Sequence, residues 1–254
     1  MHLLILQELA NVNGGDAVVL KGGMNLRLFF GSVRYSEDMD LDGDPESLDA
    51  IRSCIKGVFR DGAFIGKLQG IGVRGLDPGE GPNKDTETTF RYKFGVIMTG
   101  DVRYPTKVEV SFRGRYAGDR SVVGVPGGRF FQDYGIEPRP VRSYARDAAV
   151  RQKIDALAGR REAQARDVFD LSVLVSGVLD KPLLTFLASG LSRERLDEAR
   201  ERAFAITFDE YKGTVLEFLD DDARARYGTE DVWDDFQLQA SALIEAVLSR
   251  KGET

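Results

Sequence analysis

The sequence predicts an α+β protein in which mixed strands and helices are followed by a helical half. The first observation is that apolar residues at 90, 92, 94, 96 and 98 alternate with Thr89, Arg91, Lys93 and Gly95, which is typical of a half-buried strand. The second is a series of helical patterns that fills the chain from about residue 140 onward. The third is composition: of the 254 residues, 42% are hydrophobic and 30% are charged, as in an ordinary globular domain.

The first half alternates between the two kinds of element. A helical pattern over 2–12 is followed by a short apolar strand at 17–20, which ends in a glycine turn. A second helix is expected to begin at those glycines, and Asp44 with Pro45 has the form of an N-cap followed by a first-turn proline. The remaining predicted elements are a strand at 34–41, a helix after Pro45, a loop or hairpin at 66–87, a turn at 101–106 and strands at 89–98 and 107–113.

The second half predicts helices only. Thr207 and Glu210 have the spacing of a capping box, in which each side chain bonds the other's backbone N–H. A segment rich in proline and glycine at 125–142 marks the seam, so we predict a core domain at 1–135 and a helical domain at 136–254. The expected helices cover 143–158, 162–178, 181–189, 192–204, 207–219 and 229–250.

Composition also excludes several classes of protein. The sequence has no run of 18 apolar residues, so no membrane-spanning helix is expected. Cys54 is the only cysteine, which rules out an internal disulfide and fits the reducing cytoplasm. His2 is the only histidine, and its position in the first turn argues against a Ser–His–Asp triad. The formal net charge of −6 argues weakly against a chain coated with nucleic acid, although a local basic groove is compatible with it.

Two carboxylates spaced two residues apart are the most informative feature of the sequence. On an extended strand, Asp38 and Asp40 project from the same face, whereas Met39 points the other way. Paired carboxylates suit Mg²⁺, which proteins usually hold by one or two carboxylates together with substrate phosphates. Upstream, Gly22 and Gly23 let the backbone approach a phosphate closely, and a helix that begins there offers free N–H groups. The combination predicts phosphoryl or nucleotidyl transfer.

Other side chains have both a functional and a structural interpretation. Glu109 on the polar face of its strand would complete a two-metal site, or it forms a cross-strand ion pair. The hydroxyl of Ser36 would donate to a triphosphate oxygen, or it is a surface residue. Asp38 to Asp49 also has EF-hand spacing, but apolar Met39 and Leu41 do not belong in a solvated calcium loop, so we reject that site.

A second informative stretch is the basic segment 142–166. Within it, Lys153 would neutralise phosphate charge in a transition state, although the charge taken alone favours a solvated helix face with ion pairs. At the end of this segment, Arg166 lies on an otherwise apolar helix together with Asp167 and Asp170. Acids at such positions are commonly structural partners of an arginine.

Taken in order, these motifs resemble those of the AbiEii/MenT-like nucleotidyltransferases, the toxins of bacterial type IV toxin–antitoxin and abortive-infection systems. Segments 21–27 and 34–40 resemble the first motif, and 107–110 resembles the lysine–apolar–acid strand. Lys153 takes the place of the helix lysine, and 166–171 resembles the arginine–aspartate helix. The resemblance extends over about residues 5–180.

This resemblance implies a fold, a chemistry and partners. The fold is a DNA polymerase β-like nucleotidyltransferase core, a mixed sheet with flanking helices, followed by a helical region. The chemistry needs Mg²⁺ and a nucleoside triphosphate (NTP), and the implied acceptor is the 3′ end of tRNA. A winged-helix antitoxin is the implied partner. By match, the metal ligands are Asp38, Asp40 and Glu109, the residues needed for activity include Lys153 and Asp167, and the nucleotide contacts are Lys21, Gly22, Gly23, Ser36 and Arg166.

Two other functions are compatible with the same residues. One is a nucleotidyltransferase that acts on a small hydroxylated metabolite, such as an aminoglycoside, and needs no basic groove. The other is a catalytically inactive module that binds a nucleotide or a partner.

Overall fold

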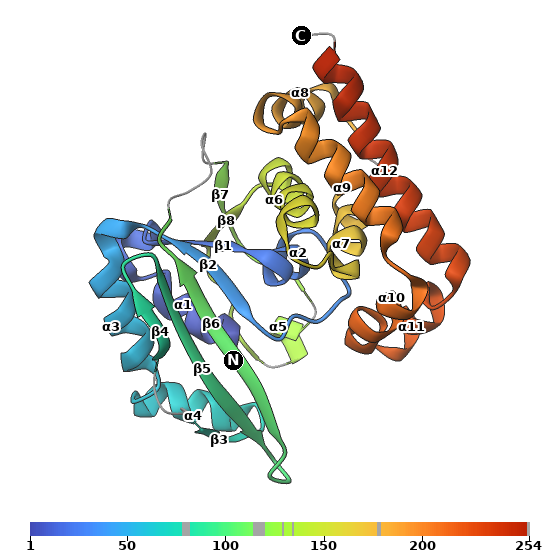
Figure 1. The fold of residues 1–254 in the computed structure, drawn as a ribbon. Helices are drawn as coiled ribbons and strands as arrows, with labels where there is room; N and C mark the ends of the chain where they lie inside the picture. Colours follow the sequence, from blue (N-terminus) through green and yellow to red (C-terminus); the bar gives the residue numbers. More distant parts are fainter. Residues whose placement is uncertain (78–81, 114–119, 129, 134, 177–178, 253–254) are drawn as a thin grey trace. The chain divides into compact units, whose positions relative to one another are not determined.

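The computed structural model describes residues 1–77, 82–113, 120–128, 130–133, 135–176 and 179–252 (Figure 1). The chain divides into two compact units. The first consists of Met1–Phe29 and Ser36–Tyr144, and the second of Phe30–Tyr35 and Ala145–Thr254. The predicted class is confirmed, because the first unit holds a mixed sheet with flanking helices and the second is helical.

Within the described residues, the sheet of the first unit has eight strands in the order β3-β5-β6-β2-β1-β8-β7, with β4 paired to β5. β2 is antiparallel to β1 and parallel to β6, so it lies in the middle of the sheet. The strands are β1 Val18–Lys21, β2 Met39–Gly43, β3 Val73–Asp77, β4 Pro82–Thr86, β5 Thr89–Met98, β6 Arg103–Ser111, β7 Ser121–Gly124 and β8 Val141–Tyr144.

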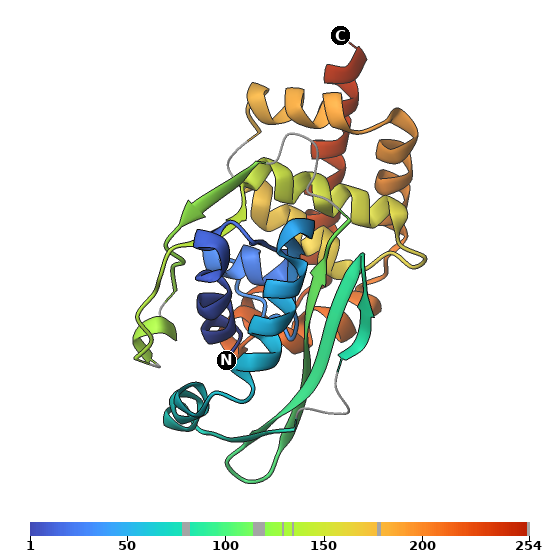
Figure 2. The same ribbon diagram turned by 90° about the vertical axis from the view of Figure 1, so that its left-hand side faces the viewer.

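One face of this sheet packs into the hydrophobic core of the first unit. Phe90, Phe94 and Val108 point into it and are almost fully buried, and Phe59 stacks on Tyr92 with ring centroids 4.9 Å apart. Helices α1 and α3 cover this face (Figures 1 and 2). The odd-numbered residues of β5 and β6 therefore point to the opposite, polar face. The helices of this unit are α1 His2–Leu9, α2 Gly22–Phe29, α3 Leu48–Val58, α4 Gly62–Gly70 and α5 Phe130–Asp133.

The second unit packs around aromatic residues. Trp233 is 1% exposed and stacks on Tyr211 at 4.6 Å between ring centroids. The predicted capping box at Thr207 and Glu210 is confirmed. The segment 30–35 belongs to this unit, where the N–H of Tyr35 donates to the carbonyl of Phe218 at 2.8 Å. The helices are α6 Arg146–Gly159, α7 Ala165–Val175, α8 Lys181–Gly190, α9 Arg193–Ala205, α10 Phe208–Thr214, α11 Asp221–Tyr227 and α12 Glu230–Gly252.

Several predicted elements differ from those observed. The strand predicted at 34–41 begins only at Met39, so Asp38 lies just before it. Helix α4 was not predicted, because its three glycines weaken the helical pattern. It is stabilised instead by Asp61, whose side chain accepts a hydrogen bond from the N–H of Phe64 at 2.9 Å. In the predicted loop at 66–87, the structure has the end of α4, then β3 and β4, while 78–81 lie outside the described residues.

The carboxy-terminal edge of the first unit also differs from the prediction. Strand β8 pairs with β1 and with the edge strand β7 of this sheet, so the boundary placed after residue 135 falls inside this unit. Helix α11 was missed between two predicted helices, and its N-cap is the side chain of Asp220. None of the helices in the described ranges combines the length and the apolar character that a membrane-spanning segment needs.

Candidate active site

Charged side chains form a row in register across four strands on the polar face of the sheet. Lys21 on β1 is the direct partner of Asp40 on β2, and Asp40 is the direct partner of Glu109 on β6. Glu109 in turn faces Arg91 on β5. The order across the sheet is therefore base, acid, acid, base. Like charges directly opposite each other are unfavourable, so the acid pair at the centre of the row calls for an additional cation.

The electrostatics of Asp40 show how close the predicted acids lie. Burial raises the pKa of Asp40 above its ordinary value, and the charges of Asp38 and Glu109 raise it further. The ammonium groups of Lys107 and Lys21 act in the opposite direction. The structure thus brings Asp38, Asp40 and Glu109 into one electrostatic cluster on the first unit.

The two outer acids of this cluster have basic partners. The carboxylate of Asp38 lies 2.8 Å from Nζ of Lys107, and Glu109 accepts a hydrogen bond from Nε of Arg91. The sequence allowed Glu109 to form a cross-strand ion pair, and its partner is Arg91 rather than a residue of its own strand. Asp40 makes no ion pair with any residue in the described part of the chain.

The donor chemistry of this cluster fits a divalent cation. Carboxylate oxygens are the ligands that Mg²⁺ prefers, and the facing carboxylates of Asp40 and Glu109 provide negative charge that a cation would neutralise. In the arrangement observed, no three His, Cys, Asp or Glu side chains among the described residues are placed to share one metal ion.

A glycine leaves room for the Asp40 carboxylate at the start of helix α2. The helix begins at Gly22, as the sequence predicted, and Gly22 has a φ of +70°. A Cβ atom added there would lie 3.1 Å from Oδ2 of Asp40. Glycine is therefore required twice at this position, for its left-handed backbone and for the space that the Asp40 carboxylate occupies.

We expect Gly22→Ala to lower both stability and nucleotide transfer. The left-handed conformation costs about 1–2 kcal/mol for a residue with a Cβ, and the new methyl group would displace the Asp40 carboxylate. Transfer assays and thermal unfolding measure the two effects. Gly57→Ala is the matched control, because Gly57 lies inside α3 with no atom near the added Cβ, and alanine there should stabilise the helix by up to about 1 kcal/mol. Full activity in Gly22→Ala would show that the close approach to Asp40 is unimportant.

Asp42 is a buried acid that the sequence analysis did not select. It is 4% exposed, and it lies two residues after Asp40 on the polar side of β2. Its carboxylate accepts a hydrogen bond from the Tyr144 hydroxyl at 2.7 Å and lies 2.5 Å from Nζ of Lys21. Asp42 therefore fixes the ammonium group of Lys21 at the end of the row, beside Asp40. The available signal was a third acid at strand spacing after Asp38 and Asp40.

Two other predicted nucleotide contacts also lie in the first unit. The hydroxyl of Ser36 donates to the carbonyl of Asp38 at 3.0 Å, which supports the turn that leads into β2. Gly23 is the second residue of α2 and is partly buried.

Of the remaining predicted site residues, Lys153 and Asp167 belong to a buried ion cluster in the second unit, whereas Arg166 on α7 is only partly buried and is not one of its ion-pair members. Nζ of Lys153 on α6 lies 2.8 Å from Asp167 and 2.6 Å from Asp170, both on α7. Arg34 lies 3.3 Å from Asp170, and Arg160 lies 3.0 Å from Asp167. Both aspartates are fully buried. The interpretation of Asp170 as the partner of an arginine is confirmed, and the arginine comes from the distant segment 30–35.

The ion cluster overcomes the effect of burial on its members. Burial alone would lower the pKa of Lys153, but Asp170 and Asp167 raise it above its ordinary value. Burial alone would raise the pKa of Asp167, but Lys153 and Arg160 lower it, with a smaller contribution from half-buried Arg166. The lysine and Asp167 are therefore both charged near neutral pH.

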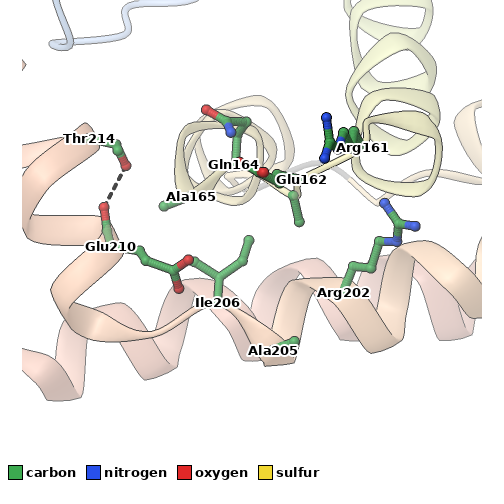
Figure 3. Close-up of a pocket in the computed structure, with 10 residues that line it drawn as sticks. Arg161, Glu162, Gln164, Ala165, Arg202, Ala205, Ile206, Glu210 and Thr214 are labelled. Carbon is green, nitrogen blue, oxygen red and sulfur yellow. Dashed lines mark hydrogen bonds between the residues drawn. The ribbon is translucent and has the colours of Figure 1, made fainter.

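A separate cavity of about 490 Å³ lies in the second unit, between the start of α7 and helices α9 and α10 (Figure 3). Its charged lining residues include Arg202 and Glu210, and the charged group of each already has a partner within the protein. Arg202 pairs with Glu198, and Glu210 belongs to the capping box of Thr207. The cavity contains none of the predicted catalytic acids.

The model of the family described as nucleotidyl transferase AbiEii toxin, type IV toxin–antitoxin system, matches residues 4–239. The chain belongs to the AbiEii family. It is therefore a nucleotidyltransferase and the toxin component of a type IV toxin–antitoxin system, as the motifs implied. A comparison with curated proteins found no match to this sequence.

Solved structures of similar proteins agree with the fold of this AbiEii protein. MenT4, a nucleotidyltransferase toxin from Mycobacterium tuberculosis H37Rv, superposes with a TM-score of 0.62 at 20% identity, covering 96% of this chain and 81% of that one. JHP933 from Helicobacter pylori superposes with a TM-score of 0.55 at 19% sequence identity, covering 98% of this chain and 90% of that one. A putative nucleotidyltransferase from H. pylori superposes with a TM-score of 0.50 at 16% sequence identity, covering 98% of this chain and 92% of that one.

Proposed function

We propose that this AbiEii protein uses Mg²⁺ to transfer a nucleotide from an NTP to the 3′ end of tRNA in the cytoplasm. The acceptor hydroxyl oxygen bonds to the α-phosphorus, the bond to the bridging oxygen breaks, pyrophosphate leaves and the hydroxyl proton passes to water. The observation that carries the proposal is the facing acid pair of Asp40 and Glu109 beside the Gly22 turn.

Residues of the first unit are proposed to bind the cation and the triphosphate. Asp38, Asp40 and Glu109 would hold Mg²⁺, which when bound neutralises triphosphate charge and lowers the pKa of an acceptor hydroxyl. The free N–H groups at Gly22 and Gly23 would bind phosphate oxygens at the start of α2. Lys21, held by Asp42, adds positive charge on the same side, and Ser36 supports the turn that carries Asp38.

Residues of the second unit are proposed to support activity. Lys153 and Asp167 would do so by fixing the ion cluster that includes Arg34, which precedes Asp38 by four residues in the chain. Arg166, next to Asp167 on α7, is proposed to bring its positive charge to a nucleotide phosphate.

The proposal is tested by incubating the protein with each α-labelled NTP, total tRNA and Mg²⁺, and separating the products on a gel. We expect label on tRNA with at least one NTP, and none with Asp38→Ala. Parallel reactions replace tRNA by an aminoglycoside, which tests the small-metabolite alternative. Retained labelling by Asp38→Ala would contradict the site, and labelling of the small acceptor alone would contradict the substrate.

The family implies an antitoxin partner. We propose that this partner is a winged-helix protein. Co-expression of such a protein from the neighbouring gene should relieve any growth defect that the toxin causes.

A further inference from the structure

Next to the acid pair, the sheet also places two lysines directly opposite each other. Lys93 on β5 is the direct partner of Lys107 on β6, two residues along from the pair of Arg91 and Glu109. Facing like charges destabilise a sheet, as in the acid pair. Lys107 is partly compensated by Asp38 at 2.8 Å. Lys93 is exposed and has no ion pair anywhere in the described ranges, so its charge remains uncompensated.

The order of strands separates this lysine pair from the groups proposed to bind the triphosphate. The strands run β5-β6-β2-β1, so the acids on β2 and β6 lie in the middle. Lys21 and the start of α2 lie on the β1 side, where a Cβ on Gly22 would meet Asp40. Lys93 lies on the β5 side, beyond Glu109. Lys21 with the start of α2 and Lys93 therefore lie on opposite sides of the acids, an arrangement that suits two different anions, the triphosphate being one of them.

Neighbouring charges on the β5 side are already compensated. Arg91 pairs with Glu109, and Arg103, farther along β6, pairs with Asp77 at 2.8 Å. Gly95 leaves room for this second pair, because a Cβ there would meet the Arg103 side chain. Of these basic residues on β5 and β6, Lys93 alone keeps a free ammonium group within the described part of the chain.

We infer that Lys93 and Lys107 bind a phosphodiester of the acceptor strand, close to the hydroxyl that receives the nucleotide. A phosphate between the two ammonium groups replaces their repulsion by two attractions. The acceptor is therefore a nucleic-acid end, and a polycationic small molecule such as an aminoglycoside is repelled by the same lysines. This inference rests on the proposed nucleotidyl transfer.

The test compares Lys93→Ala and Lys93→Glu with wild type in steady-state transfer to tRNA. We expect Lys93→Glu to raise the KM for tRNA about tenfold or more while the KM for the NTP changes less than twofold. In Lys93→Ala, the slope of log(kcat/KM) for tRNA against log[salt] should become shallower by about 0.7, the value for one contact to a single strand. Lys67→Glu, at an exposed lysine on α4, is the matched control and should change none of these quantities.

A binding measurement separates this inference from the proposed function. Fluorescence anisotropy with a labelled single-stranded RNA, without NTP, reports the lysine pair even if no transfer occurs. Weaker binding by Lys93→Glu than by Lys67→Glu supports the inference, whether or not the wild type turns over. A higher KM for the NTP in place of tRNA, or RNA binding equal to that of the control, would overturn it.

Discussion

Replacing Asp40 by asparagine is expected to abolish nucleotide transfer and to leave the folded protein at least as stable as wild type. Asp40 faces Glu109 across the sheet and lies against the start of α2, so it is the acid most central to the proposed cation site. Asparagine has nearly the same shape but no charge. It therefore removes a cation ligand and, at the same time, the repulsion between two facing carboxylates.

The stability gain in Asp40→Asn should depend on pH in a defined direction. Burial and the neighbouring acids raise the pKa of Asp40 in the folded state above 3.8, its ordinary value. Ionisation of Asp40 therefore opposes folding, fully at pH values above the folded pKa and not at all below the unfolded one. Relief of one cross-strand repulsion is worth up to about 1 kcal/mol. The Asp40→Asn variant should therefore be more stable than wild type near neutral pH and equally stable in acid.

Thermal unfolding at several pH values without divalent cations, together with the transfer assay, measures both effects. Asp49→Asn is the matched control, because Asp49 is an exposed acid on α3 whose only ion pair among the described residues is with Arg52, one turn away. The Asp49→Asn variant should retain transfer activity and show no comparable gain in stability near neutral pH. Loss of stability in Asp40→Asn at neutral pH would show that the carboxylate is a structural group rather than a strained functional one.

The sequence was most informative where chemistry follows from local spacing. The alternation over 89–98 predicted β5, and the glycines at 22 and 23 predicted the start of α2. Asp38 and Asp40 were found because residues two apart on a strand share a face. In contrast, the direct pairing of Asp40 with Glu109 depends on the register between β2 and β6, which no local pattern encodes.

The contacts that the sequence could not predict are those between distant segments. Arg34 and Asp170 are 136 positions apart, so their ion pair is visible only once both segments have folded. Asp42 appeared to be one more acid in an acidic stretch, and its function in holding Lys21 needs Tyr144 from β8. Each of these partners is set by tertiary structure, which also overrode the low helical propensity of α4.

The two units differ in how their charged side chains are compensated. In the first unit, like charges face each other on the polar side of the sheet, at Asp40 with Glu109 and at Lys93 with Lys107. In the second, the charges of Asp167 and Asp170 are fully buried and each faces two basic groups. Uncompensated charge suits ligand binding, whereas compensated buried charge makes the fold sensitive to the loss of any member.

Lys153→Met is accordingly expected to be the most destabilising of the substitutions considered. Methionine has a similar length, so it leaves no large cavity, but it removes the cation that both buried aspartates share. Breaking a buried pair by removing one partner typically costs about 3–5 kcal/mol, because the remaining charge stays buried. Urea unfolding followed by the fluorescence of Trp233 reports this loss directly, since Trp233 is the only tryptophan and is buried in the second unit.

The pH dependence of Lys153→Met distinguishes loss of charge from loss of packing. In wild type, the stabilising effect of Lys153 is present below its ordinary pKa of 10.5 and is lost as pH rises through its higher folded pKa. That of Asp167 is present above 3.8 and is lost as pH falls through its lower folded pKa. Without the lysine, burial favours the protonated form of Asp167, so the deficit of the variant should shrink as pH falls from 8 to 5.

The matched control for Lys153→Met is Asp209→Ala, which breaks an exposed ion pair with Lys212 in the same unit. Such surface pairs contribute about 0–1 kcal/mol, so this variant should unfold near the wild-type urea concentration. A deficit for Lys153→Met that is equal at pH 5 and pH 8 would mean that the methylene groups of Lys153, rather than its charge, hold α6 to α7. A deficit no larger than that of the control would mean that Arg34 and Arg160 suffice to compensate the buried aspartates.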